Sequence, residues 1–317
     1  RGDHRRSSFR GDGRGGVRVD SSRWLSPRGK GIVYALLGGS LWGVGGVAGE
    51  YLLVDRGVSA AWLTATRLLL GGFLLLAAEA LRKRRLLFSV WQEPGLCQSL
   101  FLFGILGMLA TQYCYFAAIK ASNAPTATIL QFLNPILILG WYWLSERRWP
   151  RGRELLCILG ALVGTLCLVT RGNFGTLAVS GAALFWGLLS AGAAAVYTIQ
   201  PRHMITHHGT PLIVGWGMMV GGLCFLPLAR PWGEAVPEDI AFWGAYTFVI
   251  IFGTVLSFSL YLMSTTYIAP AETSLLGAVE PVVSVLFSLW LFSFLLNGWE
   301  LFGMALILVT VITVTRG

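Results

Sequence analysis

The sequence predicts an all-α integral membrane protein of ten transmembrane helices, arranged as two inverted five-helix repeats (5+5). Of the 317 residues, 55% are hydrophobic and only 12% are charged, and the mean hydropathy is +0.67. Soluble domains carry about a quarter charged residues, so most of this surface must face lipid. The apolar runs are long and continuous, unlike the ten-residue alternations of a membrane barrel. The chain also repeats itself, with five runs in each half.

Ten apolar runs are long enough, or nearly so, to form a spanning helix of about 20 residues. Each run must be helical because backbone polar groups find no other partner in hydrocarbon. Short segments rich in Gly, Pro, Asp and Arg separate the runs. The runs are Gly31–Leu53, Ala60–Ala80, Cys97–Ile119, Ala124–Ser145, Leu155–Val169, Leu177–Ile199, Leu212–Ala229, Ile240–Tyr267, Ala271–Phe294 and Leu301–Val314.

Most of the 24 lysines and arginines fall on one side of this predicted topology. They gather in residues 1–30, 82–85 and 147–153. Basic loops stay in the cytoplasm, so we expect a multi-pass protein of the cell (inner) membrane with both termini cytoplasmic. The net charge of +9 is then a signal for topology and for anionic lipid. We therefore expect the lipid bilayer, and no nucleic acid, as a partner.

Three segments are expected along the chain. Residues 1–30 are rich in Arg, Gly and Ser, which predicts a disordered basic cytoplasmic tail. Residues 31–172 and 173–317 predict the first and second five-helix repeats.

The two repeats correspond at an offset of 146 residues. At this offset Leu133-Asn134-Pro135 meets Val279-Glu280-Pro281, and Tyr115 meets Tyr261. Because five is odd, the second repeat must start from the opposite face of the membrane. Inverted repeats are common in secondary transporters, which bind substrate at mid-membrane between them.

Motifs in both halves carry a family resemblance. The motifs are Leu41-Trp42-Gly43, Trp62-Leu63-Thr64-Ala65-Thr66-Arg67, Gln112-Tyr113-Cys114-Tyr115-Phe116-Ala117-Ala118-Ile119, Ala127-Thr128-Ile129-Leu130-Gln131-Phe132-Leu133-Asn134-Pro135, Phe185-Trp186-Gly187, Gly215-Trp216-Gly217-Met218, Gly253-Thr254 and Val279-Glu280-Pro281. On these motifs, the chain from about Lys30 onward resembles an EamA-type member of the drug/metabolite transporter superfamily. The resemblance implies a ten-helix carrier that exports amino acids or other metabolites, with helices 1, 3, 4, 6, 8 and 9 lining a central cavity. It does not specify the substrate.

Polar groups inside a bilayer are costly and usually face the bundle interior or a water-filled cavity. The candidate substrate-binding residues are Trp42, Gln112, Tyr115, Gln131, Asn134, Trp186, Tyr197, Tyr261 and Glu280. Side-chain amides both donate and accept hydrogen bonds, which suits an uncharged polar or zwitterionic solute. Hydrogen bonding between helices is the alternative role for the amides. The tryptophans either stack on a substrate cation or only pack.

The charged candidates have two roles each. Glu280 is a cation-binding or proton-coupling carboxylate, or else a neutral, hydrogen-bonded residue that stabilises a proline kink. Asn134 at the corresponding position cannot titrate, which favours the second role. Arg67 binds a substrate carboxylate, or else forms a structural ion pair with Glu50 or Glu79, and the ion pair is favoured.

The sequence therefore predicts a secondary-active transporter of a small polar metabolite, amino acid-like or an amine, that works by alternating access in the direction of efflux. H⁺ is the favoured coupling ion, with exchange and facilitated diffusion as alternatives. No motif for ATP hydrolysis or metal-dependent chemistry occurs, and the five cysteines form no metal-binding pair. We expect no enzyme activity, no cofactor and no metal. The alternatives are a membrane-embedded enzyme and a non-transporting assembly subunit. The oligomeric state is open, a homodimer being one arrangement compatible with the sequence.

Overall fold

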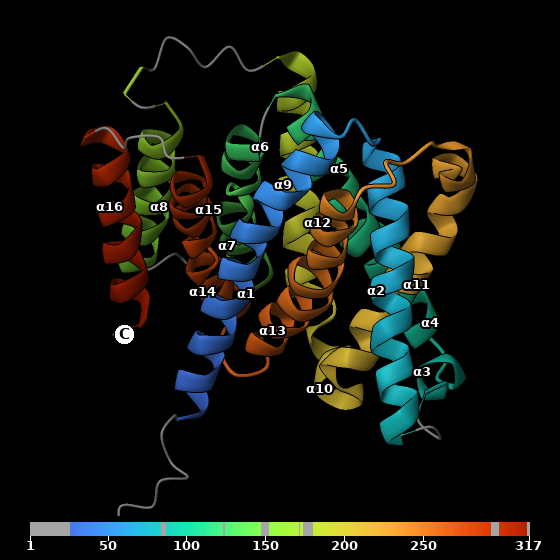
Figure 1. Ribbon diagram of the computed structural model, residues 1–317. Coiled ribbons are helices and arrows are strands. Elements are labelled where there is room, and N and C mark those ends of the chain that lie inside the picture. The colour runs from blue at the N-terminus through green and yellow to red at the C-terminus, as the bar shows by residue number, and fades with distance from the viewer. Residues whose placement is uncertain are drawn as a thin grey trace, which may run out of the picture.

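The computed structural model describes residues 26–83, 87–122, 124–146, 152–170, 172–173, 180–292 and 298–315. These residues form helices and no strand (Figure 1). The elements are α1 (Pro27–Glu50), η1 (Tyr51–Asp55), α2 (Ala60–Lys83), α3 (Ser89–Gln92), α4 (Leu96–Leu102), η3 (Phe103–Leu109), α5 (Ala110–Ala121), α6 (Ala124–Gln131), α7 (Asn134–Glu146), α8 (Gly152–Thr170), α9 (Gly181–Ile199), α10 (Arg202–His208), α11 (Thr210–Ala229), η5 (Pro231–Gly233), α12 (Ile240–Ile250), η6 (Ile251–Leu256), α13 (Ser257–Ser264), α14 (Pro270–Leu276), α15 (Val279–Phe292) and α16 (Gly298–Thr315).

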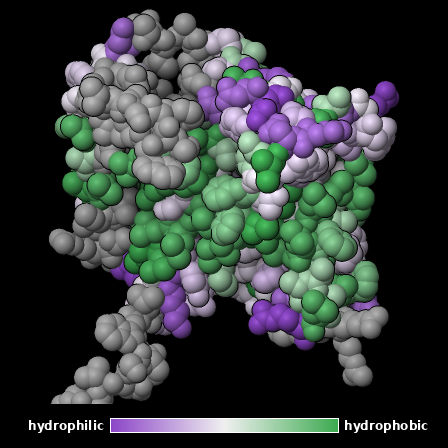
Figure 2. All heavy atoms as spheres, viewed as in Figure 1, coloured by the Kyte–Doolittle hydropathy of each residue, from purple (hydrophilic) through white to green (hydrophobic). Residues whose placement is uncertain are grey.

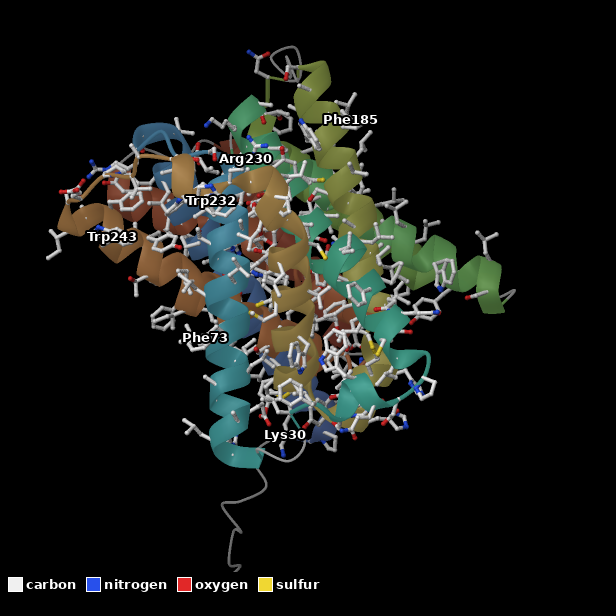
Figure 3. All side chains as sticks on the ribbon, turned by 90° about the vertical axis from the view of Figure 1, so that its right-hand side faces the viewer. Lys30, Phe73, Phe185, Arg230, Trp232 and Trp243 are labelled. Atoms are coloured by element: carbon white, nitrogen blue, oxygen red, sulfur yellow. The ribbon has the colours of Figure 1, made fainter. Side chains whose placement is uncertain are left out.

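The long helices run between two ends of the molecule, and a band of hydrophobic side chains covers the surface between those ends (Figures 1 and 2). The start of α1 and the end of α16 both lie at the lower end. Lys30 lies at this lower end, whereas Arg230 and Trp232 lie at the upper end (Figure 3). Together with the helices described next, the band identifies a multi-pass membrane protein.

Six helical stretches of the described residues are long and apolar enough to cross a membrane. They are Pro27–Asp55, Ala60–Arg82, Leu96–Ala121, Gly181–His208, Thr210–Ala229 and Ile240–Ser264. Two shorter apolar stretches are Leu155–Gly164 and Leu301–Thr310. The six are fewer than the ten spans predicted, because two of the other four predicted spans are interrupted and two are short.

The interruptions correct the sequence prediction of two continuous helices. α6 ends at Gln131 and α7 begins at Asn134, while α14 ends at Leu276 and α15 begins at Val279. The prolines of the two corresponding motifs explain this difference, because a proline is tolerated within the first turn of a helix but not in its interior. Each motif therefore starts a new helix instead of kinking one helix.

The predicted disordered tail was also too long by four residues. α1 begins at Pro27, with the Ser26 side chain accepting a hydrogen bond from Gly29 N at 3.1 Å. Serine before the first turn and proline at its start are strong signals for a helix N-terminus. The rest of the predicted tail, residues 1–25, lies outside the described residues.

Two segments of π-helix lie at corresponding places in the two halves. η3 spans Phe103–Leu109 and η6 spans Ile251–Leu256, so at the repeat offset of 146 residues most of η3 corresponds to η6. Such wider turns are rare in proteins, and those that occur are often found at functional sites. Both belong to helices that continue directly, η3 into α5 and η6 into α13.

Glycines bring helices of the two halves close together at the centre of the molecule. A Cβ atom on Gly45 of α1 would lie 2.9 Å from the Gly253 Cα of η6, and one on Gly43 would lie 2.5 Å from the Glu280 carbonyl oxygen. Real Cβ atoms do not approach backbone this closely, so α1 depends on these glycines to reach η6 and α15. α1 also packs along α13, and α2 packs along α11.

Polar contacts join two loops at the upper end. Arg56 donates to Asp239 at 2.8 Å and to the Tyr51 hydroxyl at 2.5 Å, and the Tyr51 bond raises the pKa of Arg56 above its ordinary value. The backbone N–H and the hydroxyl of Ser59 both donate to the Glu234 carboxylate. These contacts fix the start of α2 against the loop before α12.

Candidate functional site

A cavity lies among helices from both halves of the chain. The volume of the cavity is about 50 Å³. At ~10–15 Å³ for each water-sized group, it holds roughly three to five of them. The lining residues are Trp42, Gly45 and Gly46 of α1, Arg67 of α2, Thr111, Gln112 and Tyr115 of α5, Gln131 of α6, Tyr197 of α9, Gly253 of η6, Phe258 of α13 and Glu280 of α15. Seven of the predicted residues, Arg67 included, are thus brought together.

Gln112 is a buried polar residue of the cavity wall that has no hydrogen-bond partner in the described part of the chain. Its side chain is only 3% exposed, yet within the described part of the chain neither its amide nitrogen nor its amide oxygen has a hydrogen-bond partner. The hydroxyl of the adjacent Thr111 is buried and unpaired in the same sense. Buried polar groups in proteins almost always have partners, so this wall is unusual in presenting unpaired donors and acceptors to the cavity.

Arg67 carries a positive charge into the cavity wall. It is 6% exposed, and its guanidinium donates to Thr254 Oγ1 at 2.9 Å and to the Gly253 carbonyl at 3.2 Å. Its Cζ lies 4.7 Å from the centre of the Phe116 ring. All of these partners are uncharged, so the charge is not neutralised by a carboxylate among the described residues.

The η6 segment shapes the site that holds Arg67. Thr254 Oγ1 accepts a hydrogen bond from Arg67 and donates one to the Val249 carbonyl at 2.7 Å. Its hydroxyl therefore serves as donor and as acceptor. The wide turn thereby presents a carbonyl and a hydroxyl to the same guanidinium. The predicted Arg67–Glu50 pair is absent from these contacts, because Glu50 instead hydrogen-bonds the backbone N–H of Ala124 at the start of α6.

Glu280 brings a carboxyl group to the cavity. It is 8% exposed and stands in the first turn of α15, directly after the interruption. The partial positive charge of a helix N-terminus favours a carboxylate at this place. No side chain of the described residues donates a hydrogen bond to it among the contacts found, so its carboxyl group is available to the cavity.

Aromatic rings form the third wall. The Trp42 ring lies 4.8 Å from that of Phe258 and 6.1 Å from that of Tyr197, edge-on in both pairs. Tyr197 and Phe258 are 5.7 Å apart. A cation beside Glu280 would therefore also face aromatic rings, which attract positive charge.

Tyr115 and Gln131 complete the lining with groups that already have protein partners. The Tyr115 hydroxyl is 3.0 Å from Thr128 Oγ1, and Gln131 Nε2 donates to Ser190 Oγ at 2.6 Å. Both side chains link neighbouring helices as well as facing the cavity.

Three other predicted residues lie outside the lining. Ser274 Oγ donates to the side-chain oxygen of Asn134, and Trp186 packs edge-on against Tyr113 at 5.5 Å. Tyr261 is fully buried behind Trp42, with the two rings 4.7 Å apart. These side chains join helices around the cavity.

Sequence reasoning missed five lining residues. They are Gly45, Gly46, Thr111, Gly253 and Phe258. Glycines carry no side-chain signal for a site, and a phenylalanine in a hydrophobic helix looks like any packing residue. The repeat offered one usable signal, because Phe258 lies 146 residues after Gln112.

The described residues contain no group of three or more His, Cys, Asp or Glu side chains arranged to hold a metal ion. The lining of the cavity presents hydrogen-bonding groups, one guanidinium, one carboxyl group and aromatic rings.

Known proteins resemble this chain over most of its length. The inner membrane transporter YicL of Salmonella typhimurium, named as uncharacterised, is 38% identical over 288 residues, covering 90% of this chain and 95% of that protein. The pseudopaline exporter CntI of Pseudomonas aeruginosa is 27% identical over 247 residues, covering 73% and 81%. The threonine/homoserine exporter RhtA of Salmonella typhimurium is 25% identical over 258 residues, covering 79% and 80%.

A solved crystal structure has the same fold, with a TM-score of 0.75 at 19% sequence identity over 91% of this chain and 98% of that one. The model of the EamA-like transporter family matches the chain in two places, residues 29–170 and 181–316. The chain therefore belongs to the EamA-like transporter family and is a membrane transporter.

Proposed function

We propose that this protein is a secondary-active carrier that exports a small zwitterionic metabolite, amino acid-like or an amine, by alternating access. The observation that supports this most is the cavity between the two halves. It combines one guanidinium, one carboxylate and an amide without partners in a space of about 50 Å³. A solute with a carboxylate and an ammonium group would satisfy all three.

The proposed binding mode follows from the charges. Arg67 has only uncharged partners, and a buried charge without a counter-ion is costly, so a substrate carboxylate would stabilise it. Glu280 and the aromatic wall would receive the ammonium group, and Gln112 would bond either group. Two relatives are named as exporters, one of threonine and homoserine, which agrees with a small amino acid and with the direction of efflux.

The proposed architecture is ten spans in two inverted repeats, residues 31–172 and 173–317. The family model matches each half separately. The helix contacts are also paired: α1 packs along α13 as α9 packs along α5, and α8 packs along α16. Interruptions at Asn134 and Val279 give each half one broken helix, a common feature of transporters built from inverted repeats.

The proposed orientation places both termini in the cytoplasm. The start of α1 and the end of α16 share one end of the molecule, which requires an even number of crossings. The basic segments around residues 82–85 and 147–153 follow α2 and α7, which also run down to that end (Figure 1). Basic loops stay inside.

The proposed coupling ion is H⁺, carried by Glu280. A carboxylate that both a proton and a substrate ammonium can neutralise couples the two by competition. We propose this role in place of the kink-stabilising role that the sequence favours, since α15 starts at Val279, one residue before Glu280, instead of bending there.

The experiment is uptake into liposomes that contain the purified protein. Radiolabelled threonine and homoserine would be compared with threonine amide, a cation, and N-acetylthreonine, an anion. We expect saturable uptake of the zwitterions, stimulated by unlabelled solute on the opposite side, because a carrier exchanges substrate and a channel does not. Absence of saturable flux with folded protein would instead favour an assembly subunit, and chemical conversion of a solute would favour an enzyme.

The coupling proposal has its own test in the same liposomes. We expect Glu280→Gln to remove the dependence of uptake on an imposed pH gradient while exchange of zwitterions persists, since the variant side chain cannot release a proton. Glu79→Gln, outside the cavity, is the matched control. Unchanged pH-driven uptake by Glu280→Gln would contradict the role of Glu280.

A further inference from the structure

The offset of 146 residues relates two sets of three polar residues that surround the cavity. Each set has a tyrosine and a hydroxyl residue from one half of the chain. Its third residue comes from the other half, where it stands in the first turn of the helix that follows the interruption. The lower triad is Tyr261, Ser274 and Asn134, and the upper triad is Tyr115, Thr128 and Glu280. Adding the offset converts Tyr115 into Tyr261, Thr128 into Ser274 and Asn134 into Glu280.

The lower triad is joined across the two halves of the chain. Ser274 Oγ donates to the side-chain oxygen of Asn134, and the Tyr261 hydroxyl lies near the hydroxyls of Ser274, Thr198 and Tyr197. Asn134 and Ser274 belong to different halves of the chain. Tyr261 packs against Trp42, so this network lies directly behind the cavity lining and ties the halves together there.

The upper triad is connected at only one of its two joints. The Tyr115 hydroxyl bonds Thr128 Oγ1 at 3.0 Å, which corresponds to the Tyr261–Ser274 contact. The counterpart of the Ser274–Asn134 bond would join Thr128 to Glu280. That bond is not among the contacts of these two described residues, and the Glu280 side chain lines the cavity instead.

The two triads lie on opposite sides of the cavity. Thr128 is the fifth residue of α6, which starts at the upper end, and Ser274 is the fifth residue of α14, which starts at the lower end (Figure 1). Apolar packing agrees with a closed lower side, because Tyr197, Phe258 and Tyr261 belong to one buried cluster with Met108 and Leu68.

We propose that the two triads are the two gates of the carrier. The structure then has the lower gate closed by the Ser274–Asn134 bond and the upper gate open, with Glu280 released into the cavity. The conformational change to the other state breaks the hydrogen bond between Ser274 and Asn134 and forms one between Thr128 and Glu280. This inference rests on the proposed alternating access and assigns gate roles to Asn134 and Tyr261, which lie outside the cavity lining.

The test measures access to the cavity without using any substrate. A single cysteine, Gln112→Cys, would report on the cavity in a protein whose five native cysteines are replaced by alanine or serine. A membrane-impermeant thiosulfonate would be added to right-side-out vesicles and to inverted vesicles. The rate of cysteine modification from each face is the readout.

Removing the lower bond should open the lower face. We expect Ser274→Ala and Asn134→Ala to raise modification from the lower face by at least about threefold, the factor for one average hydrogen bond between membrane helices. Modification from the upper face should fall. Ser274→Thr keeps the hydroxyl and should leave both rates unchanged, which controls for packing.

Removing the upper partner should act in the opposite direction. We expect Thr128→Val to lower modification from the lower face, because the upper gate then lacks its closing bond, while Thr128→Ser restores the rate. The exchange Asn134→Glu with Glu280→Asn should move access toward the lower face. Equal changes at both faces, or none, in folded Ser274→Ala and Thr128→Val would overturn the gate assignment. If these variants still transported substrate and showed unchanged cysteine modification, the gate assignment would be refuted and the proposed carrier function would not.

Discussion

At the scale of single residues, the site is defined by polar groups that the protein leaves without partners. Gln112 has two unpaired amide atoms, and Glu280 has a carboxyl group that faces the cavity. Gln131 looks the same in sequence, yet its amide is already bonded to Ser190. All three are polar residues within apolar runs of the sequence, and only the structure separates the groups without protein partners from those that join helices.

Gln112 provides the sharpest residue-scale prediction. Replacing it by leucine removes an unsatisfied buried amide, which costs about 1–3 kcal/mol. We expect Gln112→Leu to denature at an equal or higher temperature in detergent, while its KM for zwitterion uptake rises about tenfold. Gln131→Leu should do the reverse for stability, because Ser190 Oγ then loses the hydrogen bond that it accepts from Gln131 Nε2. A Gln112→Leu protein that unfolds more easily would show that the amide has a structural role.

At the scale of elements, the sequence predicted where apolar helices lie and missed how two of them are built. Hydrophobicity is continuous through Leu133 and through Ala278, so it gives no sign of an interruption. The proline motifs carried that information, because proline is accommodated best where a helix starts. The wide turns η3 and η6 were likewise invisible, since a π-helix has no composition of its own.

Gly43 tests how the broken helix is held. Its replacement by alanine would put a Cβ atom 2.5 Å from the Glu280 carbonyl oxygen, so α1 and α15 must separate. We expect Gly43→Ala to lower the yield of folded protein and to reduce uptake strongly. Gly192→Ala is the matched control, because nothing lies within 4 Å of its Cβ position, and alanine is the better helix former by about 1 kcal/mol. Equal loss in both variants would contradict close packing at the interruption.

At the scale of the whole molecule, the repeat explains more than any single motif. The offset of 146 residues in the sequence pairs Asn134 with Glu280 and Tyr115 with Tyr261. The repeat did not reveal which side of the cavity is closed, because both halves carry nearly the same groups. That difference depends on which hydrogen bonds are formed, and composition does not encode it.

Orientation can be checked at the same scale. Single cysteines would replace Trp232, at the upper end, and Lys30, at the lower end (Figure 3). We expect an impermeant maleimide to label Trp232→Cys in intact cells and Lys30→Cys only after permeabilisation, because the basic lower end should face the cytoplasm. Labelling of both positions from outside would rule out the proposed topology.

The small size of the cavity has a consequence for discrimination among solutes. Closely packed walls such as Trp42, Tyr197 and Phe258 resist expansion, and forcing extra volume into such packing costs about 1–3 kcal/mol. A bulky analogue with the right charges would meet this cost while the walls close around it, more than during first contact. The protein would then select solutes by size during the conformational change and not at binding. Oversized molecules would occupy the site, slow the transport cycle and behave as inhibitors.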